Sequence, residues 1–219
     1  MDPLQSSTTS GTTATIAQIA SLIKPKVHLI LSGKRKCGKD FLEQIMLERF
    51  PEAILSYRIS APIKGAFARQ NGLDFAELLT ASQYKEQYRQ QMVVWSEAIR
   101  ASDPHFFLRL AIAEAAAKTD PKPIWLLNDA RRPTDLHYFA DSSEIDMSAT
   151  QVIKLRIVSS EATRFSRGWV FTPGIDDQTT ECGLDAHSEW DYIIHNDSTK
   201  EDLLCALEPV FKRISELID

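Results

Sequence analysis

A short strand that runs into a turn rich in glycine and lysine, and then into a helix, narrows the possible folds of this chain more than any other feature. Val27–Ser32 is a compact apolar run, and residues 33 to 40 read Gly-Lys-Arg-Lys-Cys-Gly-Lys-Asp. Phe41, Leu42, Ile45 and Met46 follow at helical spacing. Glycines so placed let backbone N–H groups face an anion at a helix start, and a lysine reaches the outer phosphates. The pattern predicts a nucleotide phosphate site.

The chain has only eight glycines, so Gly33 and Gly38 would occur at this spacing by chance less often than in a glycine-rich chain. The alternative is a tight turn with solvated lysines. We expect Lys39 to bridge the outer phosphates, whereas the other loop cations either face the polyanion or are solvated. These are Lys34, Arg35 and Lys36.

Asp40 stands where most loops of this kind have a Ser or Thr hydroxyl on magnesium. A carboxylate is a hard ligand and can serve the same ion directly or through a water. The alternative is a simple interaction between the carboxylate and the positive end of the helix dipole. We expect Mg²⁺ as cofactor.

Short β-branched runs alternate with longer helical patterns, which predicts an α/β fold of three layers, α/β/α, around a five-stranded, mainly parallel sheet. A helical insertion is expected from Pro62 to Lys118, strongest over Tyr84–Arg100 and Pro104–Ala117, and a closing helix over Lys200–Leu217. The expected strands are Val27–Ser32, Ile54–Ile59, Ile124–Asn128, Val152–Val158 and Tyr192–His195.

A length of 219 residues suits one α/β domain. Gln5–Thr15 is almost entirely Ser, Thr, Gly and Ala, which is typical of a disordered tail, although Ala14–Ile23 could form a short amphipathic helix. We therefore expect a disordered tail over residues 1–24 and one domain over 25–219.

Charge and composition restrict the partners. With 25 Lys and Arg against 30 Asp and Glu, the net charge of −5 disfavours nucleic acid as a partner. No apolar run approaches the length of a membrane helix. Three scattered cysteines and a first segment without Lys or Arg before Lys24 indicate a reducing, cytosolic setting without a leader peptide. Nothing indicates an obligate interface, so we expect a monomer.

The strand Ile124–Asn128 ends in Asp129, which suits a carboxylate near magnesium, and Arg131 and Arg132 follow. Ligands bind at this edge of parallel sheets. Alternatively, Asp129 is a turn or capping residue and the arginines are solvated.

Basic residues also mark the insertion and a later segment. Lys85 and Arg89 are four apart and project from one helix face. Arg164 and Arg167 precede a glycine-containing stretch that we interpret as a lid closing over the nucleotide, the alternative being a long surface loop. The insertion contributes Lys64, Lys85, Arg89, Arg100 and Arg109. So many cations in an acidic chain indicate an anionic acceptor. If the acceptor is a phosphate, its oxygen is already deprotonated and no general base is needed.

Several motifs resemble those of the animal-type phosphomevalonate kinase family. They are Ser32–Asp40, Ser82-x-Tyr84-Lys85, Ile124-Trp-Leu, Asp129-x-Arg131-Arg132, Arg167-Gly-Trp-Val-Phe-Thr-Pro-Gly-Ile-Asp-Asp177 and Glu181-Cys-Gly-Leu-Asp185. The resemblance runs from about Lys26 to the last helix, and the segment from Arg167 to Asp185 is more specific than the phosphate loop.

The resemblance implies a P-loop kinase fold like that of nucleoside monophosphate kinases, with a lid and a helical acceptor-binding insertion. It implies transfer of the γ-phosphate of ATP, the co-substrate, to (R)-5-phosphomevalonate in isoprenoid and sterol synthesis.

Residue roles follow by motif. Lys36, Lys39, Arg131 and Arg167 would be catalytic, and Asp40 and Asp129 would serve the metal. ATP would be held by Gly33, Lys34, Arg35, Lys36, Cys37, Gly38, Lys39, Asp40, Arg164, Arg167 and Asp197, the last standing where related chains can have His. Phosphomevalonate would be held by Lys64, Lys85, Arg89, Arg100, Arg109, Arg131, Arg132 and Asn196.

Two other functions compete. A nucleoside monophosphate kinase would use similar cations for its acceptor phosphate. A GTP-dependent switch would bind nucleotide without a small-molecule acceptor, but the chain has neither an Asn-Lys-x-Asp nor an Asp-x-x-Gly motif.

Overall fold

The computed structural model describes residues 25–80, 83–117, 121–141 and 150–219. The chain divides into two compact units, one within Arg58–Asp120 and the other within Lys24–Tyr57 and Pro121–Asp219. We call them the helical unit and the sheet unit. The predicted tail over 1–24, with its possible helix, and Ser82 lie outside the described residues.

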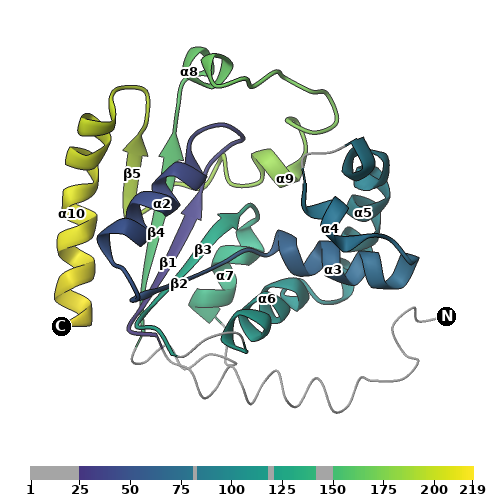
Figure 1. The fold of residues 1–219 in the computed structure, drawn as a ribbon, viewed down its shortest axis with the longest axis horizontal. Coiled ribbons are helices and arrows are strands. Elements are labelled where there is room, and N and C mark those ends of the chain that lie inside the picture. Colours follow the sequence, from purple (N-terminus) through teal and green to yellow (C-terminus); the bar gives the residue numbers. More distant parts are fainter. Residues whose placement is uncertain (1–24, 81–82, 118–120, 142–149) are drawn as a thin grey trace. The chain divides into compact units, whose positions relative to one another are not determined.

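The sheet unit holds five parallel strands in the order β2-β3-β1-β4-β5 (Figure 1). The strands are β1 (Val27–Ser32), β2 (Ile54–Tyr57), β3 (Ile124–Ala130), β4 (Gln151–Val158) and β5 (Tyr192–His195). The predicted α/β class, strand number and parallel pairing are confirmed. With β1 in the centre and β3 and β4 on either side, the carboxyl ends of the strands meet at one edge, where ligands bind in sheets of this kind.

Three predicted strand limits were wrong, the smallest error being at β4, which begins at Gln151 rather than Val152. β2 ends at Tyr57 rather than Ile59, because α3 (Ser60–Asn71) begins directly afterwards, with Ile59 already in helical conformation as its N-cap. β3 continues two residues past Asn128, and its register with β1 shifts between Ile30 and Ser32. Such bulges re-aim side chains at a strand end.

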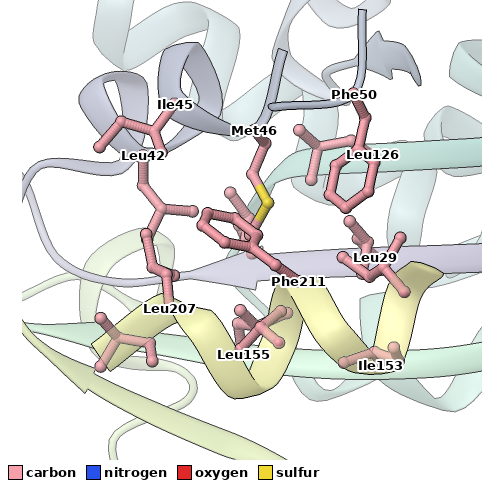
Figure 2. Close-up of a cluster of buried hydrophobic side chains, with 14 of the residues drawn as sticks. Leu29, Leu42, Ile45, Met46, Phe50, Leu126, Ile153, Leu155, Leu207 and Phe211 are labelled. Atoms are coloured by element: carbon pink, nitrogen blue, oxygen red, sulfur yellow. The ribbon is translucent and has the colours of Figure 1, made fainter. Parts of the chain in front are cut away.

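One face of the sheet packs on α2 (Lys39–Arg49) and α10 (Lys200–Ile218). Alternate residues of the central strands point to this side, and Figure 2 shows Leu29, Leu126 and Leu155 against Met46 and Phe211. Thr199 begins α10 with a capping box, which satisfies two backbone donors at the helix start. The closing helix extends one residue beyond its predicted end.

The other face of the sheet packs on α7 (Pro133–Asp141), a helix that the sequence patterns did not predict. His28 of β1 is buried here, with its ring centroid 4.5 Å from that of Phe139 and its Nε2 2.8 Å from the Tyr57 hydroxyl. Complete burial lowers the pKa of His28 to about 3, so the imidazole is neutral. The predicted three-layer arrangement is therefore confirmed.

The helical unit lies between β2 and β3 in the sequence, where an insertion was predicted. Its helices are α3, α4 (Phe75–Leu79), α5 (Gln83–Ser102) and α6 (Phe106–Ala116). Phe67, Leu78 and Met92 form a small core of their own. The two helices predicted most strongly correspond to α5 and α6, although α6 begins at Phe106 rather than Pro104.

No helix in the described parts of the chain is both long and apolar enough to cross a membrane.

Candidate active site

The phosphate loop, Gly33 to Asp40, joins β1 to α2 at the carboxyl edge of the sheet. The Nζ of Lys39 donates to the carbonyl oxygens of Gly33 and Lys34, at 2.5 and 3.1 Å, so the ammonium group lies inside the curl of the loop. Gly38 caps α2 with a φ of 101°, and a β-carbon there would lie 2.2 Å from Nδ2 of Asn196. Position 38 thus requires glycine for both its backbone conformation and its neighbour.

Lys39 is the loop cation whose charge is most affected by its surroundings. Burial and the neighbouring Arg131 guanidinium lower its pKa to about 8, while Cys37, Glu181 and Asp40 oppose that shift. A phosphate chain in the loop would add negative charge and favour the ammonium form.

Three donors converge on one carbonyl oxygen of the loop. The oxygen of Cys37 accepts hydrogen bonds from Asn196 Nδ2 at 2.9 Å, Ser159 Oγ at 3.1 Å and an Arg167 guanidinium nitrogen at 3.2 Å. Arg167 also donates to the Asn196 carbonyl at 2.8 Å. The ends of β4 and β5 thereby fix the loop, and the predicted Arg167 and Asn196 lie beside it.

The segment after β4 begins with α8 (Glu161–Ser166). Arg164 of α8 is buried, with its guanidinium carbon 3.7 Å from the ring centroid of Trp169 and its Nε donating to the Arg35 carbonyl at 2.9 Å. The predicted lid arginine is therefore attached to both the loop and an indole ring, a cation–π contact that is strongest when desolvated.

Asp176 connects the same segment to the loop. Its carboxylate accepts from Trp169 Nε1 at 2.9 Å and pairs with Arg35 at 3.0 Å. Burial alone would raise the pKa of Asp176, but hydrogen bonds from Trp169 and Thr172 and the charges of Arg35 and Arg164 hold it below its ordinary value.

Two further carboxylates follow along α9 (Thr179–Cys182) and its end. Glu181 pairs with Arg131 at 2.5 Å, and Asp185 pairs with Lys34 at 2.6 Å and Arg156 at 2.8 Å. Cations of the phosphate loop and the strand ends are thus balanced by acids from a single segment.

The end of β3 carries a polar amide, Asn128, that contacts α2. Asn128 is buried, and its Nδ2 lies 2.5 Å from Glu43 Oε2 and 3.3 Å from Asp40 Oδ1. Glu43 also accepts from the Ser56 hydroxyl. The carboxylates of Asp40 and Glu43 therefore lie on either side of the same amide group.

Beyond Asn128, the charge of Asp129 contributes, after burial and Tyr138, to a raised pKa of Tyr57. The backbone N–H groups of Arg131 and Arg132 both donate to the buried Asp135 carboxylate, at 2.8 and 3.0 Å. Asp135 lies in the first turn of α7 and fixes the chain that carries both arginines.

Among the remaining predicted residues of the sheet unit, Lys36 is exposed with a φ of 61°. Asp197 is exposed and accepts from the Ser160 backbone N–H at 2.7 Å. Hydrogen bonds from Thr163 and Ser160 hold the pKa of Asp197 below its ordinary value.

The basic residues of the insertion all belong to the helical unit. Arg100 is buried with its guanidinium carbon 5.2 Å from the Phe107 ring centroid, and Arg109 pairs with Asp103. Arg89 pairs with Glu86 at 2.5 Å on the surface of α5. Lys64 on α3 and Lys85 on α5 are partly buried.

Sequence reasoning missed several side chains of this cluster. The rule that the carboxyl ends of parallel strands converge could have found those at the ends of β3 and β4, and three others lie in the segment already noted for its motif, whereas Glu43 lies on α2 and had no such signal. The additional residues are Glu43, Asn128, Arg156, Ser159, Asp176, Glu181 and Asp185.

Comparison with known proteins identifies the family. A family model described as phosphomevalonate kinase matches residues 31–145. A phosphomevalonate kinase of Drosophila melanogaster is 41% identical over 170 residues, covering 77% of this chain and 87% of that protein. The chain belongs to the phosphomevalonate kinase family. It is accordingly a kinase, a class of enzyme that uses ATP and acts here on a small molecule.

The matched span of the phosphomevalonate kinase family model begins at the end of β1 and ends beyond α7, so it includes the phosphate loop, the helical unit and Arg131. Among solved structures, the crystal structure of TT1252 from Thermus thermophilus is 16% identical with a TM-score of 0.48, covering 87% of this chain and 98% of that one.

Proposed function

We propose that the protein transfers the γ-phosphoryl group of ATP to (R)-5-phosphomevalonate, giving (R)-5-diphosphomevalonate and ADP in the mevalonate route to isoprenoids and sterols. The observation that carries the proposal is a Gly-x4-Gly-Lys loop with Lys39 inside its curl and Arg131 beside it, in a chain of this family. A P–O bond to the acceptor phosphate forms as the bond between the β- and γ-phosphates breaks, and ADP leaves.

The phosphate loop and its neighbours would hold the ATP phosphates. Phosphoryl transfer depends on positioning and on neutralising the charge that builds on the moving group. Lys39, Lys36, Arg131 and Arg167 supply that charge, and Arg167 is held beside the loop by Asn196 and the Cys37 carbonyl. An acceptor phosphate is already ionised at neutral pH, so no side chain is needed as general base.

The helical unit would supply most of the acceptor site. Its five predicted cations suit a substrate that carries both a phosphate and a carboxylate, because guanidinium and ammonium groups pair with both. Arg131, Arg132 and Asn196 of the sheet unit complete the proposed set. ATP would be bound by the loop residues from Gly33 to Asp40 together with Arg164, Arg167 and Asp197.

The residues beside the loop fit a magnesium ion. Asp40 and Glu43 bring carboxylate oxygens to one place, and the Oδ1 of buried Asn128 has no hydrogen-bond partner among the described residues. Magnesium is usually bound by one or two carboxylates together with substrate phosphates. When bound, it would neutralise charge on the phosphates. We propose Asp40 as its main protein contact and Asp129 as a further one.

An acceptor panel tests the proposed reaction. ATP consumption is measured with phosphomevalonate, AMP, CMP and UMP offered separately to the full chain at equal concentration. We expect turnover with phosphomevalonate alone. Turnover with a nucleoside monophosphate instead would favour the nucleoside monophosphate kinase alternative, and ATP binding without turnover of any acceptor would favour a switch protein.

A cytosolic location, a monomeric state and a single kinase domain over residues 25–219 complete the proposal. They are consistent with small-molecule substrates. Cell fractionation and a mass measurement in solution, the latter on the full chain and on residues 25–219, would check them.

A further inference from the structure

Glu181 joins two parts of the site that are far apart in sequence. One carboxylate oxygen, Oε2, accepts from the backbone N–H of Arg35 in the phosphate loop at 2.9 Å. The other, Oε1, accepts from a guanidinium nitrogen of Arg131 after β3 at 2.5 Å. Both bonds are charge-assisted and therefore stronger than neutral ones. The same side chain thus fixes the loop backbone and an arginine proposed to neutralise the moving phosphoryl group.

The backbone around Glu181 is built for close contact. A β-carbon at Gly183 would lie 2.7 Å from the Arg131 carbonyl oxygen and 2.6 Å from that of Thr179, distances that real β-carbons essentially never show. Glycine therefore allows the end of α9 to lie directly against the chain that carries Arg131. The neighbouring Leu184 is buried and anchors the segment.

Burial makes this contact specific. Glu181 is 8% exposed, although Asp177 and Asp185 of the same segment are exposed. A buried carboxylate is costly unless it is paired and hydrogen-bonded, and Glu181 meets both conditions through Arg131 and the Arg35 N–H. Its negative charge also offsets the repulsion between two cations. Arg131 lowers the pKa of Lys39, whereas Glu181 raises it.

We propose that Glu181 is a positioning residue of phosphoryl transfer, which holds the Arg131 guanidinium and the phosphate loop in one fixed arrangement. It does not touch the reacting phosphates; it acts through Arg131. The inference rests on the proposed function, because Arg131 must serve the transferred or acceptor phosphate for its orientation to matter. Misplacement of a reacting or neutralising group by about 1 Å can cost about 100-fold in rate.

The first experiment uses Glu181→Gln, which keeps the size of the side chain and removes its charge. Glu189→Gln, an exposed acid beyond α9, is the matched control. We expect Glu181→Gln to lower kcat about 10- to 100-fold with a smaller change in the KM for ATP, because the lost interaction serves the transition state. A kcat equal to that of the control would overturn the proposal.

A double-mutant cycle asks whether Glu181 acts through Arg131. In the Arg131→Ala background, Glu181→Gln should lower kcat by less than about twofold, since residues that act as a unit are not additive. The same loss in both backgrounds would contradict the positioning role.

Chemical labelling of Arg131 tests the role of Glu181 without any acceptor substrate. Phenylglyoxal labels guanidinium groups, and peptide mass spectrometry can follow the rate at Arg131 in the free protein. We expect faster labelling in Glu181→Gln than in the parent or the Glu189→Gln control. Equal labelling rates would overturn the proposal even if phosphomevalonate proved to be a substrate.

The two failures are separable. A parent protein that does not phosphorylate phosphomevalonate would refute the proposed function, while the labelling rate would still decide the role of Glu181. If circular dichroism shows that Glu181→Gln does not fold, Glu181→Asp serves both readouts. Its shortened carboxylate should give the same direction of change in kcat and labelling, and parental values for both would overturn the proposal.

Discussion

The sheet unit buries polar side chains in two places, and it treats their charge in opposite ways. At the carboxyl edge of the sheet, the buried carboxylates of Glu181 and Asp176 pair with the guanidinium groups of Arg131 and Arg35. Beneath α7, His28 has no carboxylate partner among the described residues and is buried as the neutral form. The contrast teaches that a buried charge persists where an opposite charge pairs with it, whereas a buried imidazole without such a partner is neutral.

The largest expected effect is on kcat, when a charged side chain is removed from the carboxyl edge of the sheet. Arg131→Ala should lower kcat about 10³- to 10⁵-fold, the range found when an arginine that stabilises transferring phosphate is lost. Loss of one charged hydrogen-bond partner should cost only about 1–3 kcal/mol of unfolding free energy. Steady-state kinetics and denaturant unfolding measure the two, with Arg213→Ala on α10 as control. Near-normal kinetics would remove Arg131 from the mechanism.

A second loss of charge concerns the loop itself. Lys39→Met should lower kcat roughly 10²- to 10³-fold, as expected for one preorganised donor to developing charge, and leave the circular dichroism spectrum unchanged. Lys212→Met on the exposed side of α10 is the matched control. Full activity in Lys39→Met would show that the loop takes no part in phosphoryl transfer.

At the other place, beneath α7, a change of pH should alter the free energy of unfolding through His28. The pKa of His28 is about 3 in the folded protein and 6.5 ordinarily, so the unfolded chain binds the proton first as pH falls. The stability that neutral His28 contributes is therefore present above pH 6.5 and lost below it, by about 2 kcal/mol between pH 6.5 and 5.

Denaturant unfolding of the parent, His28→Asn and His137→Gln proteins across this pH range measures that loss. His28→Asn should show a pH slope shallower by about 1.4 kcal/mol per unit, whereas the exposed His137 should not matter. Equal slopes in all three proteins would show that His28 is not the buried titrating group.

The smallest expected effect is on the magnesium dependence of the rate. Asp40→Ala removes one proposed magnesium contact and should raise the Mg²⁺ concentration for half-maximal rate roughly tenfold. Glu48→Gln, further along α2 and exposed, is the control. An unchanged magnesium titration would leave Asp40 as a residue that interacts only with the helix dipole.

The patterns of the sequence predicted the elements whose periodicity is long or whose turn chemistry is specific. β1, the phosphate loop and α10 are such elements, and β1 and β5 were predicted to the residue. α7 was missed because nine residues after two arginines carry little periodic signal. β2 was predicted too long because the apolar Ile59 was included in its run, although Arg58 lies between Ile59 and the end of the strand.

The site divides in the same way. Lys39, Arg131 and Arg167 could be found because they lie in or beside motifs that recur at fixed spacing. Glu181 and Asn128 could not be assigned a role from sequence, because their significance depends on which distant side chain they meet. The register shift between β1 and the end of β3 is likewise not predictable from any pattern of residues.

Isothermal titration calorimetry of the full chain with MgATP and with MgAMP tests whether the phosphate loop binds the outer phosphates of a nucleotide. We predict that MgATP binds far more tightly than MgAMP, and that Lys39→Met removes most of the difference, because Lys39 lies inside the loop that would hold the β- and γ-phosphates. Equal affinity of the parent protein for the two nucleotides, or no binding of MgATP, would contradict the assignment of the loop and the kinase mechanism built on it.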